Sequence, residues 1–487
     1  MKSETRLLKR SRCLGVGGLI LAIWLATAVA ASAQTFKTLV NFDGTNGGFP
    51  EYMSLVQGED GYYYGTTEGG GPNGGPGTVF KISPNGNLTT VYSFSGADGG
   101  DPYAGLIVAL DGNFYGTTTG GGANGYGTVF KISAGGNLST LYSFCAQNGC
   151  ADGEEPIAVL VQAADGNFYG TTLYGGDPSC NAPYGCGAVF KMTPSGAMTT
   201  LHSFAGYPTD GALPSAGLIQ ATDGQLYGTT WIGGSGNGGT FFRLSLGGKL
   251  TIVHSFSYAD GLLPHGRLVQ AADGALYGTT GAGGTNGAGT VFRATLSGKL
   301  TTLYSFCSQN GCADGGTPYA GLVQGTDGNF YGTTTEGADL GCNAPYGCGA
   351  VFKITPGGNL TTLQNFDASN GSYSYGELLQ ATNGMLYGTT CLGGTYGQGT
   401  VFSLFTGLRP FVTFVSATRA IGQSVGILGQ GFTGTINVAF NGTPAGFTVI
   451  RDTFLKATVP AGATTGPVTV TTPSGTLTSN VPFRVKP

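Results

Sequence analysis

The stretch Asn329-Phe330-Tyr331-Gly332-Thr333-Thr334 contains the motif that decides the fold of this chain. Its Tyr-Gly-Thr-Thr core recurs at intervals of about 50 to 58 residues, with the tyrosine at Tyr64, Tyr115, Tyr169, Tyr227, Tyr277, Tyr331 and Tyr387. Self-similarity at this period is typical of repeats in which each copy forms one four-stranded β-sheet with its loops. The sequence therefore predicts an all-β protein built from seven copies of one unit.

Each unit divides into four predicted strands that alternate in direction. Examples of the four types, in chain order, are Leu322 to Gly325, Asn329 to Thr334, Thr78 to Ile82, and Leu300 to Phe306. The third type carries apolar side chains on both faces, as expected for a sheet that neighbouring sheets cover on both sides. Asp-Gly or Asn-Gly joins the first two strands, and we predict type I′ turns there.

The two ends of the repeat region are complementary. The seventh unit ends at Val401 to Leu404 without a fourth strand, and one extra strand of that type, Phe36 to Phe42, precedes the first unit. We expect this N-terminal strand to pair with the last unit and to close a seven-bladed β-propeller, because closure removes exposed sheet edges. An open array of hairpin units is the alternative, but it leaves the missing and the extra strand unexplained.

Composition excludes several classes of protein. Of 487 residues 92 are Gly, 11% are aromatic and only 9% are charged. The aromatic content is too high for a disordered linker protein, and the glycines lack the three-residue period of collagen. The net charge of −4 and the sparse Lys and Arg exclude an electrostatic nucleic-acid surface. No apolar run beyond residue 30 is long enough to span a membrane.

Residues 1–33 have the pattern of an export signal. Five basic residues between Lys2 and Arg12 precede the apolar stretch Leu14 to Ala30, and Ala31-Ser32-Ala33 resembles a cleavage site. We predict a mature chain that begins near Gln34 and is extracellular, periplasmic or attached to the cell surface. An uncleaved membrane anchor is the alternative.

The repeats resemble the GloVer tandem repeats of exported bacterial proteins. The shared signatures are Tyr-Gly-Thr-Thr and Gly-Thr-Val-Phe, and the resemblance covers residues 35 to 405. GloVer proteins carry varied C-terminal sorting or anchor segments. The resemblance implies export and implies no established reaction.

The predicted domains are a signal peptide at 1–33, a repeat domain at 34–407 and a separate module at 408–487. In the module, strand-like runs at Ser424 to Leu428, Ile436 to Phe440, Phe454 to Val459 and Pro467 to Thr471 alternate with turn residues. Short strands with frequent turns predict an immunoglobulin-like β-sandwich. The motifs Gly429-Gln430-Gly431-Phe432 and Thr472-Pro473-Ser474-Gly475 are similar to those of the IPT/TIG family, which implies a spacer, an adhesion module or part of a carbohydrate-active protein.

Eight cysteines form two matching sets in units three and six. Because an exported chain meets oxidising conditions, we predict the local disulfides Cys145–Cys150, Cys180–Cys186, Cys307–Cys312 and Cys342–Cys348. Cross-pairing within each set and two four-cysteine zinc sites are the alternatives. Cys391 is left over, and we expect it to be a buried thiol.

The candidate binding face follows from strand direction. The loops after the second and fourth strands share one face of the ring, and this face carries all the cysteine loops. Two features on it are candidates. An Asp-Gly pair follows most fourth strands, at Asp43, Asp98, Asp152, Asp210, Asp260 and Asp314. These carboxylates would bind calcium or sugar hydroxyls, or cap their own turns.

The second feature is aromatic. Trp231, with Tyr184 and Tyr346 in the cysteine loops, would stack on a sugar ring, and packing between sheets is the alternative. Catalytic signals are poor. Only three histidines occur, His202, His254 and His265, and the first two replace a tyrosine of the fourth strand. We expect no catalytic residue and no cofactor apart from possible calcium.

Three functions are compatible with these patterns. The first is an exported or cell-surface binding protein whose partner is a glycan or another cell-envelope component. The second is a carbohydrate-active enzyme with a pair of carboxylates on the loop face. The third is a purely structural surface protein. A carboxylate cluster in one pocket of the loop face would favour the second.

Overall fold

The computed structural model describes residues 34–72 and 74–486, so the predicted signal peptide and its cleavage site lie outside the described residues. Gln34–Pro487 form one compact unit. In the described part the chain is all-β, and its only helices are two 3-10 turns, η1 (Asn148–Cys150) and η2 (Asn310–Cys312). Neither the length nor the hydropathy of any described helix suffices for a membrane span.

The repeats form seven four-stranded antiparallel sheets. Their innermost strands are β2 (Val56–Gln57), β6 (Ile107–Val108), β10 (Val161–Gln162), β15 (Ile219–Gln220), β20 (Val269–Gln270), β24 (Val323–Gln324) and β28 (Leu379–Gln380). The second strands are β3 (Tyr63–Thr67), β7 (Phe114–Thr118), β11 (Phe168–Thr172), β16 (Leu226–Thr230), β21 (Leu276–Thr280), β25 (Phe330–Thr334) and β29 (Leu386–Thr390).

The two outer positions complete each sheet. The third strands are β4 (Thr78–Ile82), β8 (Thr128–Ile132), β12 (Ala188–Met192), β18 (Thr240–Leu244), β22 (Thr290–Ala294), β26 (Ala350–Ile354) and β30 (Thr400–Phe405). The fourth are β5 (Leu88–Ser93), β9 (Leu138–Ser143), β13 (Met198–Ser203), β19 (Leu250–Ser255), β23 (Leu300–Ser305), β27 (Leu360–Asn365) and β1 (Thr35–Asn41). A small extra ladder joins β14 (Gly211–Ala212) to β17 (Ile232–Gly233).

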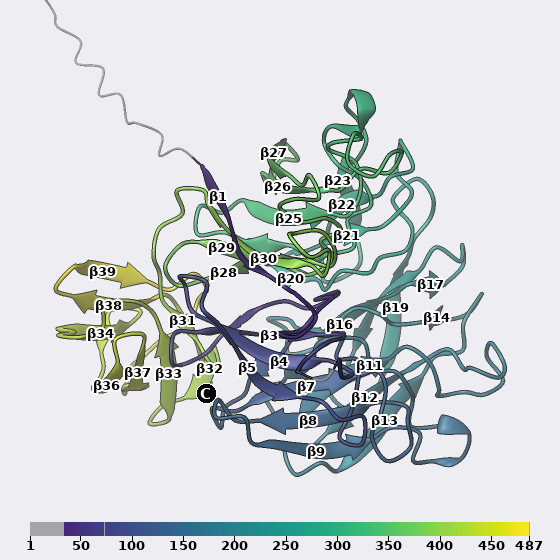
Figure 1. The fold of residues 1–487 in the computed structure, drawn as a ribbon. Coiled ribbons are helices and arrows are strands. Elements are labelled where there is room, and N and C mark those ends of the chain that lie inside the picture. Colours follow the sequence, from purple (N-terminus) through teal and green to yellow (C-terminus); the bar gives the residue numbers. More distant parts are fainter. Residues whose placement is uncertain (1–33, 73, 487) are drawn as a thin grey trace, which may run out of the picture. The chain divides into compact units, whose positions relative to one another are not determined.

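The N-terminal strand completes the last sheet, as predicted. β1 pairs antiparallel with β30 from Thr35↔Phe405 to Asn41↔Thr400, and Figure 1 shows the two strands side by side. The pairing contains a register shift between Thr38 and Val40. The six other fourth strands pair with a shift at the matching place, as at Val79/Phe80. β1 therefore reproduces the local geometry of an ordinary fourth strand although it belongs to the opposite end of the repeat region.

The Tyr and Gly of the signature organise each sheet. The tyrosine hydroxyl donates to the aspartate of the preceding turn, for example from Tyr227 Oη to Asp223 Oδ2 over 2.7 Å. The glycine leaves room for an aromatic ring of the third strand, since a Cβ added to Gly332 would lie 2.7 Å from Phe352 Cζ. The ring fills the space that a side chain would occupy.

The two threonines of the signature have different partners. The first reaches the next sheet, where Thr279 Oγ1 donates to Ala320 O over 2.8 Å. The second stays in its own sheet, where Thr280 Oγ1 and Thr290 Oγ1 are 2.9 Å apart. The signature therefore encodes contacts within a sheet and between sheets, which explains why it recurs in every unit.

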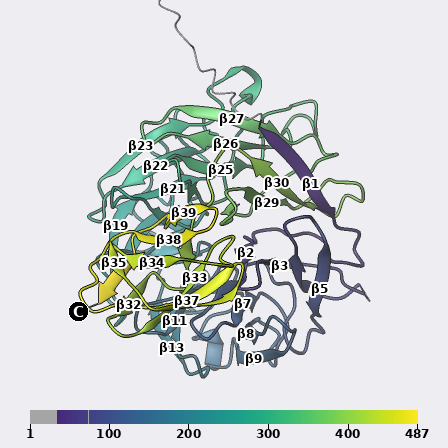
Figure 2. The ribbon, with the colours of Figure 1, turned by 90° about the vertical axis from the view of Figure 1, so that its left-hand side faces the viewer.

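A second kind of hydrogen bond joins neighbouring sheets, and it also joins the last sheet to the first. The glutamine of an innermost strand accepts a hydrogen bond from the turn of the preceding sheet, as from Ala164 N to Gln220 Oε1 over 2.8 Å. The same link connects the last sheet to the first, from Thr382 N to Gln57 Oε1 over 3.0 Å. Figure 2 shows the sheets arranged around a common centre. The all-β prediction of propeller-like repeats is thus confirmed.

The predicted type I′ turns are wrong. Of the Asp-Gly pair at Asp111 and Gly112, only the glycine has a positive φ, of 78°. Gly112 N donates to Ala109 O, so the turn begins at Ala109, one residue earlier than a two-residue hairpin turn over Asp111 and Gly112 would. The Asp111 carboxylate also accepts from Asn113 N over 3.1 Å. A turn centred on Leu110 and Asp111 with glycine in the left-handed position satisfies these groups better than type I′ does.

The C-terminal residues form two further four-stranded sheets. One contains β31 (Thr413–Phe414), β33 (Ser424–Leu428), β37 (Phe454–Thr458) and β36 (Phe447–Arg451), and the other β35 (Thr443–Pro444), β34 (Asn437–Phe440), β38 (Val468–Thr472) and β39 (Gly475–Thr478). β32 (Thr418–Ala420) pairs in parallel with β40 (Arg484–Lys486). Both sheets share one core that includes Ile427, Phe440 and Leu455. All four strand-like runs predicted here are strands.

One buried threonine joins the repeat region to the C-terminal module. Thr382 Oγ1 accepts from Gln57 Nε2 and from Gln430 Nε2, each over 2.8 Å, and donates to Gly429 O over 3.2 Å. Its hydroxyl therefore connects the first sheet, the last sheet and the module. The repeat region and the module meet on the side where the turns between first and second strands lie.

Candidate functional site

A ring of seven equivalent residues stands where the chain enters the innermost strands. Each lies three positions before the leucine that precedes the strand, and the set is Tyr52, Tyr103, Ile157, Ser215, His265, Tyr319 and Tyr375. Together these positions surround the central channel, the space enclosed by the seven innermost strands. They lie on the face of the ring that carries the cysteine loops.

Strained backbone supports this ring. Shortly before each ring residue is one with a positive φ between 53° and 58°, in the set Phe49, Asp101, Glu155, Leu213, Leu263, Thr317 and Tyr373. The N–H of each donates to the preceding sheet, as from Asp101 N to Pro76 O over 2.8 Å. Such conformations are costly for non-glycine residues and persist where the surroundings fix them, often at functional sites. Here the neighbouring sheet fixes them.

Aromatic side chains from opposite sides of the ring close the channel. The rings of Tyr52 and His265 stack with centroids 4.6 Å apart, and Tyr375 lies 5.0 Å from Tyr52. Trp231 contacts His265 edge-on at 6.3 Å. Burial lowers the pKa of His265 to about 4, so its imidazole is neutral near pH 7.

A cavity of about 550 Å³ lies on the loop side of this closure. Tyr52, Tyr103, Tyr319 and Trp231 contribute aromatic surface to its wall. This volume lies within the range of about 300 to 1,000 Å³ common for small-molecule sites. We call it the mouth cavity.

The mouth cavity is acidic. Glu68, Asp101 and Glu155 line it, and Tyr103 Oη donates to Glu68 Oε1 over 3.0 Å. Burial, and then repulsion by Glu68, raises the pKa of the Asp101 carboxyl, while burial alone raises the pKa of Glu155. Glu51, an extra residue that only the first repeat carries, hydrogen-bonds Glu68. Burial together with that contact raises the pKa of Glu51 to about 7.

Two buried polar atoms of this cavity lack a partner. Ser215 Oγ and Trp231 Nε1 make no hydrogen bond within the described residues, although both side chains line the cavity. Ser215 is only 6% exposed. An unpaired buried donor costs about 1–3 kcal/mol, so each such group in a native structure needs an explanation. Neither atom is accessible to solvent, so these two donors do not face the open part of the cavity.

Beyond the aromatic closure the channel continues as a second cavity of about 420 Å³. Apolar residues of the innermost strands line it, and Phe411 and Phe414 of the C-terminal module contribute to its wall. Arg267 and Glu377 form an ion pair of 3.0 Å at this level. Residues of the module thus form part of the wall at this end of the channel.

The structure brings only one of the sequence-predicted site residues into the mouth cavity, namely Trp231. Tyr184 and Tyr346 are 60% and 58% exposed on the cysteine loops and do not line it. The carboxylates of Asp98, Asp152, Asp210, Asp260 and Asp314 accept hydrogen bonds from their own loops. In two repeats the donor partner is His202 or His254, which binds Asp210 or Asp260 at 2.7 Å where other repeats use tyrosine.

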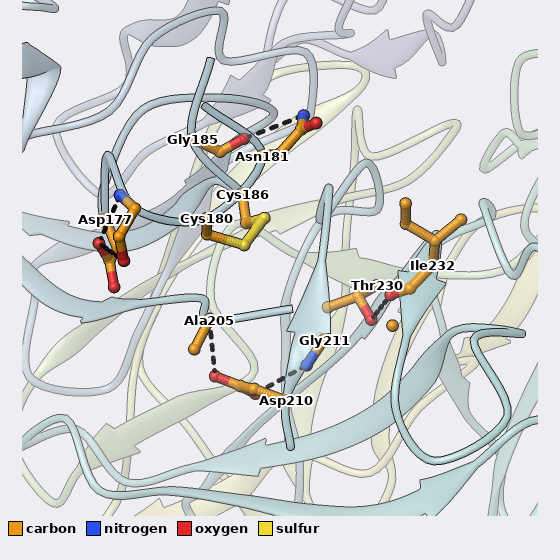
Figure 3. Close-up of a disulfide and its surroundings, with 12 residues drawn as sticks. Asp177, Cys180, Asn181, Gly185, Cys186, Ala205, Asp210, Gly211, Thr230 and Ile232 are labelled. Carbon is orange, nitrogen blue, oxygen red and sulfur yellow. Dashed lines mark hydrogen bonds between the residues drawn. A yellow bond between two sulfur atoms is a disulfide. The ribbon is translucent and has the colours of Figure 1, made fainter. Parts of the chain in front are cut away.

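The four predicted local disulfides are all present, so the zinc and cross-pairing alternatives are wrong. Figure 3 shows the disulfide Cys180–Cys186. In the neighbouring loop, the carboxylate of Asp210 accepts hydrogen bonds from the backbone N–H groups of Ala205 and Gly211. Cys391 is a buried free thiol, as predicted. Disulfides in each of two loop pairs indicate an exported protein, because cytosolic chains rarely keep them.

Sequence reasoning missed most of the mouth cavity. Tyr52, Tyr103, His265 and Tyr319 were assigned no binding role, and neither were Glu68, Asp101 and Glu155. A signal was present, because the ring residue follows directly after proline in most repeats, as in Pro102-Tyr103 and Pro264-His265. The residue type at this position varies from repeat to repeat, as expected for side chains that face the central channel and do not pack between two sheets.

The fold defines the class of this protein as a disulfide-containing repeat protein of propeller-like antiparallel sheets. Within that class, the chain belongs to the family described as the Gloeobacter/Verrucomicrobia repeat, which it matches over residues 26–183 and 179–402. No curated protein matches its sequence.

One solved structure of low sequence identity shares the fold. It is a fungal alcohol oxidase of the AA5 family, solved in complex with copper, which is 14% identical in sequence. The superposition covers 90% of this chain and 98% of the oxidase chain, with a TM-score of 0.51. An extracellular domain from B. thetaiotaomicron, described as part of a hybrid two component system, is 11% identical, covers 93% of this chain and 58% of its own, and has a TM-score of 0.49. At these identities the similarity concerns fold alone.

The titration of Glu51 gives a prediction for stability. Its raised pKa means that the folded state disfavours the charged carboxylate, so this group costs stability as the pH rises from about 4.5 to 7. Glu51→Gln should therefore stabilise the fold more at pH 8 than at pH 5, by on the order of 1 kcal/mol in the free energy of unfolding after allowance for solvent screening. Thermal unfolding at the two pH values measures it.

The control for this experiment is Asp177→Asn, which removes an exposed carboxylate whose pKa is lowered by Ser179. We expect equal effects of Asp177→Asn at pH 5 and pH 8. A Glu51→Gln variant whose shift relative to the native chain is the same at both pH values would contradict the prediction.

Proposed function

We propose that this chain is an exported or cell-surface binding protein whose mouth cavity binds a carbohydrate. In this proposal residues 34–407 form a seven-bladed β-propeller closed by β1, and residues 408–487 form an immunoglobulin-like, IPT/TIG-like sandwich that supports or anchors it. Residues 1–33 are the signal peptide. The sandwich blocks one end of the channel and leaves the mouth cavity open to a ligand of the cell envelope.

The combination of aromatic and carboxylate side chains in the lining of the mouth cavity is the observation that supports binding most directly. Sugars present many hydroxyl oxygens that accept hydrogen bonds, and their apolar ring faces stack on aromatic side chains. The cavity supplies both kinds of surface, with Trp231 and Tyr103 beside carboxylates that accept from sugar hydroxyls. The same groups on a rigid ring of sheets are held ready before binding.

A screen of the mature protein on immobilised glycans, with and without calcium, tests the proposal. Calcium dependence would support a part for the five loop aspartates Asp98, Asp152, Asp210, Asp260 and Asp314. Failure to bind any glycan or cell-envelope fraction would contradict the proposal and favour a structural surface protein.

For a glycan found in this screen, Trp231→Ala is expected to weaken binding about tenfold, because it removes stacking surface and the indole N–H. Trp231→Phe keeps an aromatic ring and loses only the donor, so its effect should be smaller. Calorimetric titration measures both.

Tyr184→Ala is the matched control, since it removes an exposed aromatic residue of the same face that does not line the cavity. It should leave affinity unchanged. The reverse pattern, with Tyr184→Ala weakening binding and Trp231→Ala not, would place the ligand on the disulfide loops instead.

A carbohydrate-active enzyme is the second candidate, and the carboxylate cluster of the mouth cavity favours it. Glycosidases commonly hold two carboxyl groups about 5 to 9.5 Å apart. Glu51 and Glu68 share a hydrogen bond and are therefore too close for either standard arrangement. Release of reducing ends from a bound oligosaccharide, lost in Glu68→Gln, would support the enzyme over the binding protein.

A further inference from the structure

The end of the channel beside the C-terminal module is apolar. The first residues of the innermost strands form a ring of aliphatic side chains, all only partly buried: Val56, Ile107, Val161, Ile219, Val269, Val323 and Leu379. Six of them line the cavity of about 420 Å³, together with Phe411 and Phe414 of the module, and we call it the channel cavity. An apolar ligand would remove this aliphatic surface from water.

A further cavity, of about 300 Å³, adjoins the channel cavity between the repeat region and the module. We call it the side cavity. Both cavities are lined by Ile107, Ile219, Arg267 and Val415, so one elongated molecule can contact both. Leu110 lines the side cavity and is 39% exposed, which places this cavity at the protein surface. The side cavity therefore lies between solvent and the channel cavity.

One cation on this path lacks a carboxylate. The charged residues of the channel cavity, Arg267 and Glu377, pair with each other at 3.0 Å. The side cavity adds Arg419 of β32, and no ion pair within residues 34–72 and 74–486 includes it. The two cavities together therefore carry one uncompensated positive charge.

The surroundings of Arg419 suit an anion. The side chain is half-buried, and burial lowers the pKa of its guanidinium. Among the described residues it donates only from Nη1, over 3.4 Å to Ser416 Oγ and 3.3 Å to Thr418 O. A partly desolvated charge without an ionic partner costs free energy, which a bound anion would offset. Carboxylates fit a guanidinium especially well, because they accept two parallel hydrogen bonds.

From this combination we infer that the channel and side cavities bind a long-chain carboxylate, with its aliphatic chain in the channel cavity and its carboxylate at Arg419. The ligand class is an ionised fatty acid. A small inorganic anion would leave the aliphatic ring in contact with water, and a glycan would place hydroxyl groups against it. The site is separate from the mouth cavity, whose charged lining residues are all acidic, so the inference does not depend on glycan binding there.

Three small molecules test the inference by calorimetric titration of the mature protein near pH 7, each below the concentration at which it forms micelles. Decanoate carries both the chain and the carboxylate, acetate only the carboxylate, and decyltrimethylammonium the same chain with the opposite charge. We expect decanoate to bind at least about a hundredfold more tightly than acetate and about tenfold more tightly than decyltrimethylammonium. Absence of decanoate binding, or equal binding of decyltrimethylammonium, would overturn the inference.

An arginine variant locates the carboxylate. Arg419→Gln removes the charge and keeps a polar side chain, and it should weaken decanoate binding about tenfold without weakening decyltrimethylammonium binding. Arg484→Gln is the matched control. Arg484 lies in β40, which pairs with β32, and burial lowers its pKa as well, but it lines neither cavity. Equal losses of decanoate affinity in the two variants would overturn the assignment of the carboxylate.

A variant that fills the cavity locates the aliphatic chain. Val323 is partly buried and lines the channel cavity, so Val323→Phe places a larger side chain there. We expect decanoate affinity to fall at least about tenfold while the thermal transition is retained. Undiminished affinity in the folded variant would overturn the placement of the chain. If the variant does not fold, Val323→Ala takes its place, and decanoate should then bind within about threefold of the native affinity; complete loss of binding would contradict a cavity with room for the chain.

Discussion

A chain that lacks residues 34–41 is expected to lose its soluble, cooperatively folded form. These residues supply β1, and without it β30 exposes a row of unpaired backbone groups at the edge of the last sheet. Phe36 stacks on Phe402 with centroids 5.3 Å apart, and Val40 is 7% exposed. Burial of such side chains contributes about 1.5–3 kcal/mol each, which is large against a total stability of about 5–15 kcal/mol.

Complementation makes the test specific. A synthetic peptide of residues 34–42 added during refolding should restore solubility and the thermal transition, because strand pairing and burial are regained without a covalent link. A scrambled peptide of equal composition is the control. Size-exclusion chromatography and differential scanning fluorimetry measure both. A truncated chain that melts within 3 °C of the native protein would show that closure contributes little.

The second large effect is expected for Gly332→Ala in the signature of the sixth repeat. A Cβ at this position would lie 2.7 Å from Phe352 Cζ and 2.8 Å from Leu322 Cδ2, both in the interior of the sheet packing. Phe352 is fully buried, so it cannot move aside without displacing its neighbours. Overpacking of this kind costs about 1–3 kcal/mol or more.

Gly357→Ala in the same repeat is the matched control. Its φ is not in the left-handed region, and the nearest atom to an added Cβ is Thr355 Oγ1 at 3.8 Å. We expect no loss of stability there, or a small gain from the reduced freedom of the unfolded chain. Denaturant unfolding of the two variants compares the effects directly. Equal midpoints for both would contradict the close packing assigned to the signature glycine.

Much of the fold was predictable because its information is local and repeated. Four-residue signatures, turn dipeptides and apolar third strands gave seven sheets with nearly correct bounds, as at Thr78–Ile82. The cysteine spacing also led to the correct disulfides. The turn type was wrong because the aspartate side chain and the glycine together allow a longer turn. The strands β31, β32, β35, β36, β39 and β40 of the module were missed, because all of them except the five-residue β36 have only two to four residues and show no clear alternation.

The candidate site was harder to predict, since its residues come from six different repeats. Trp231 was selected for its rarity, whereas Glu68, Asp101 and Glu155 looked like ordinary loop acids in sequence. In sequence, aspartates such as Asp98 and Asp260 cannot be told apart from these three acidic residues. In the structure, each of these aspartates accepts hydrogen bonds within its own turn. Only the curvature of the ring separates carboxylates that face the channel from those that stabilise a loop.

Four features could be predicted without coordinates: the repeat, the order of the strands, the pairing of the first segment with the last, and the disulfides. Each of these follows from side chains close together in the chain or from a missing and an extra copy of one strand. Tertiary structure alone decided that Tyr52 meets His265 and that unpaired carboxylates share one cavity with Ser215 and Trp231. The physical reason is that the channel is enclosed only when all sheets are in place, so no single repeat contains the information for what faces it.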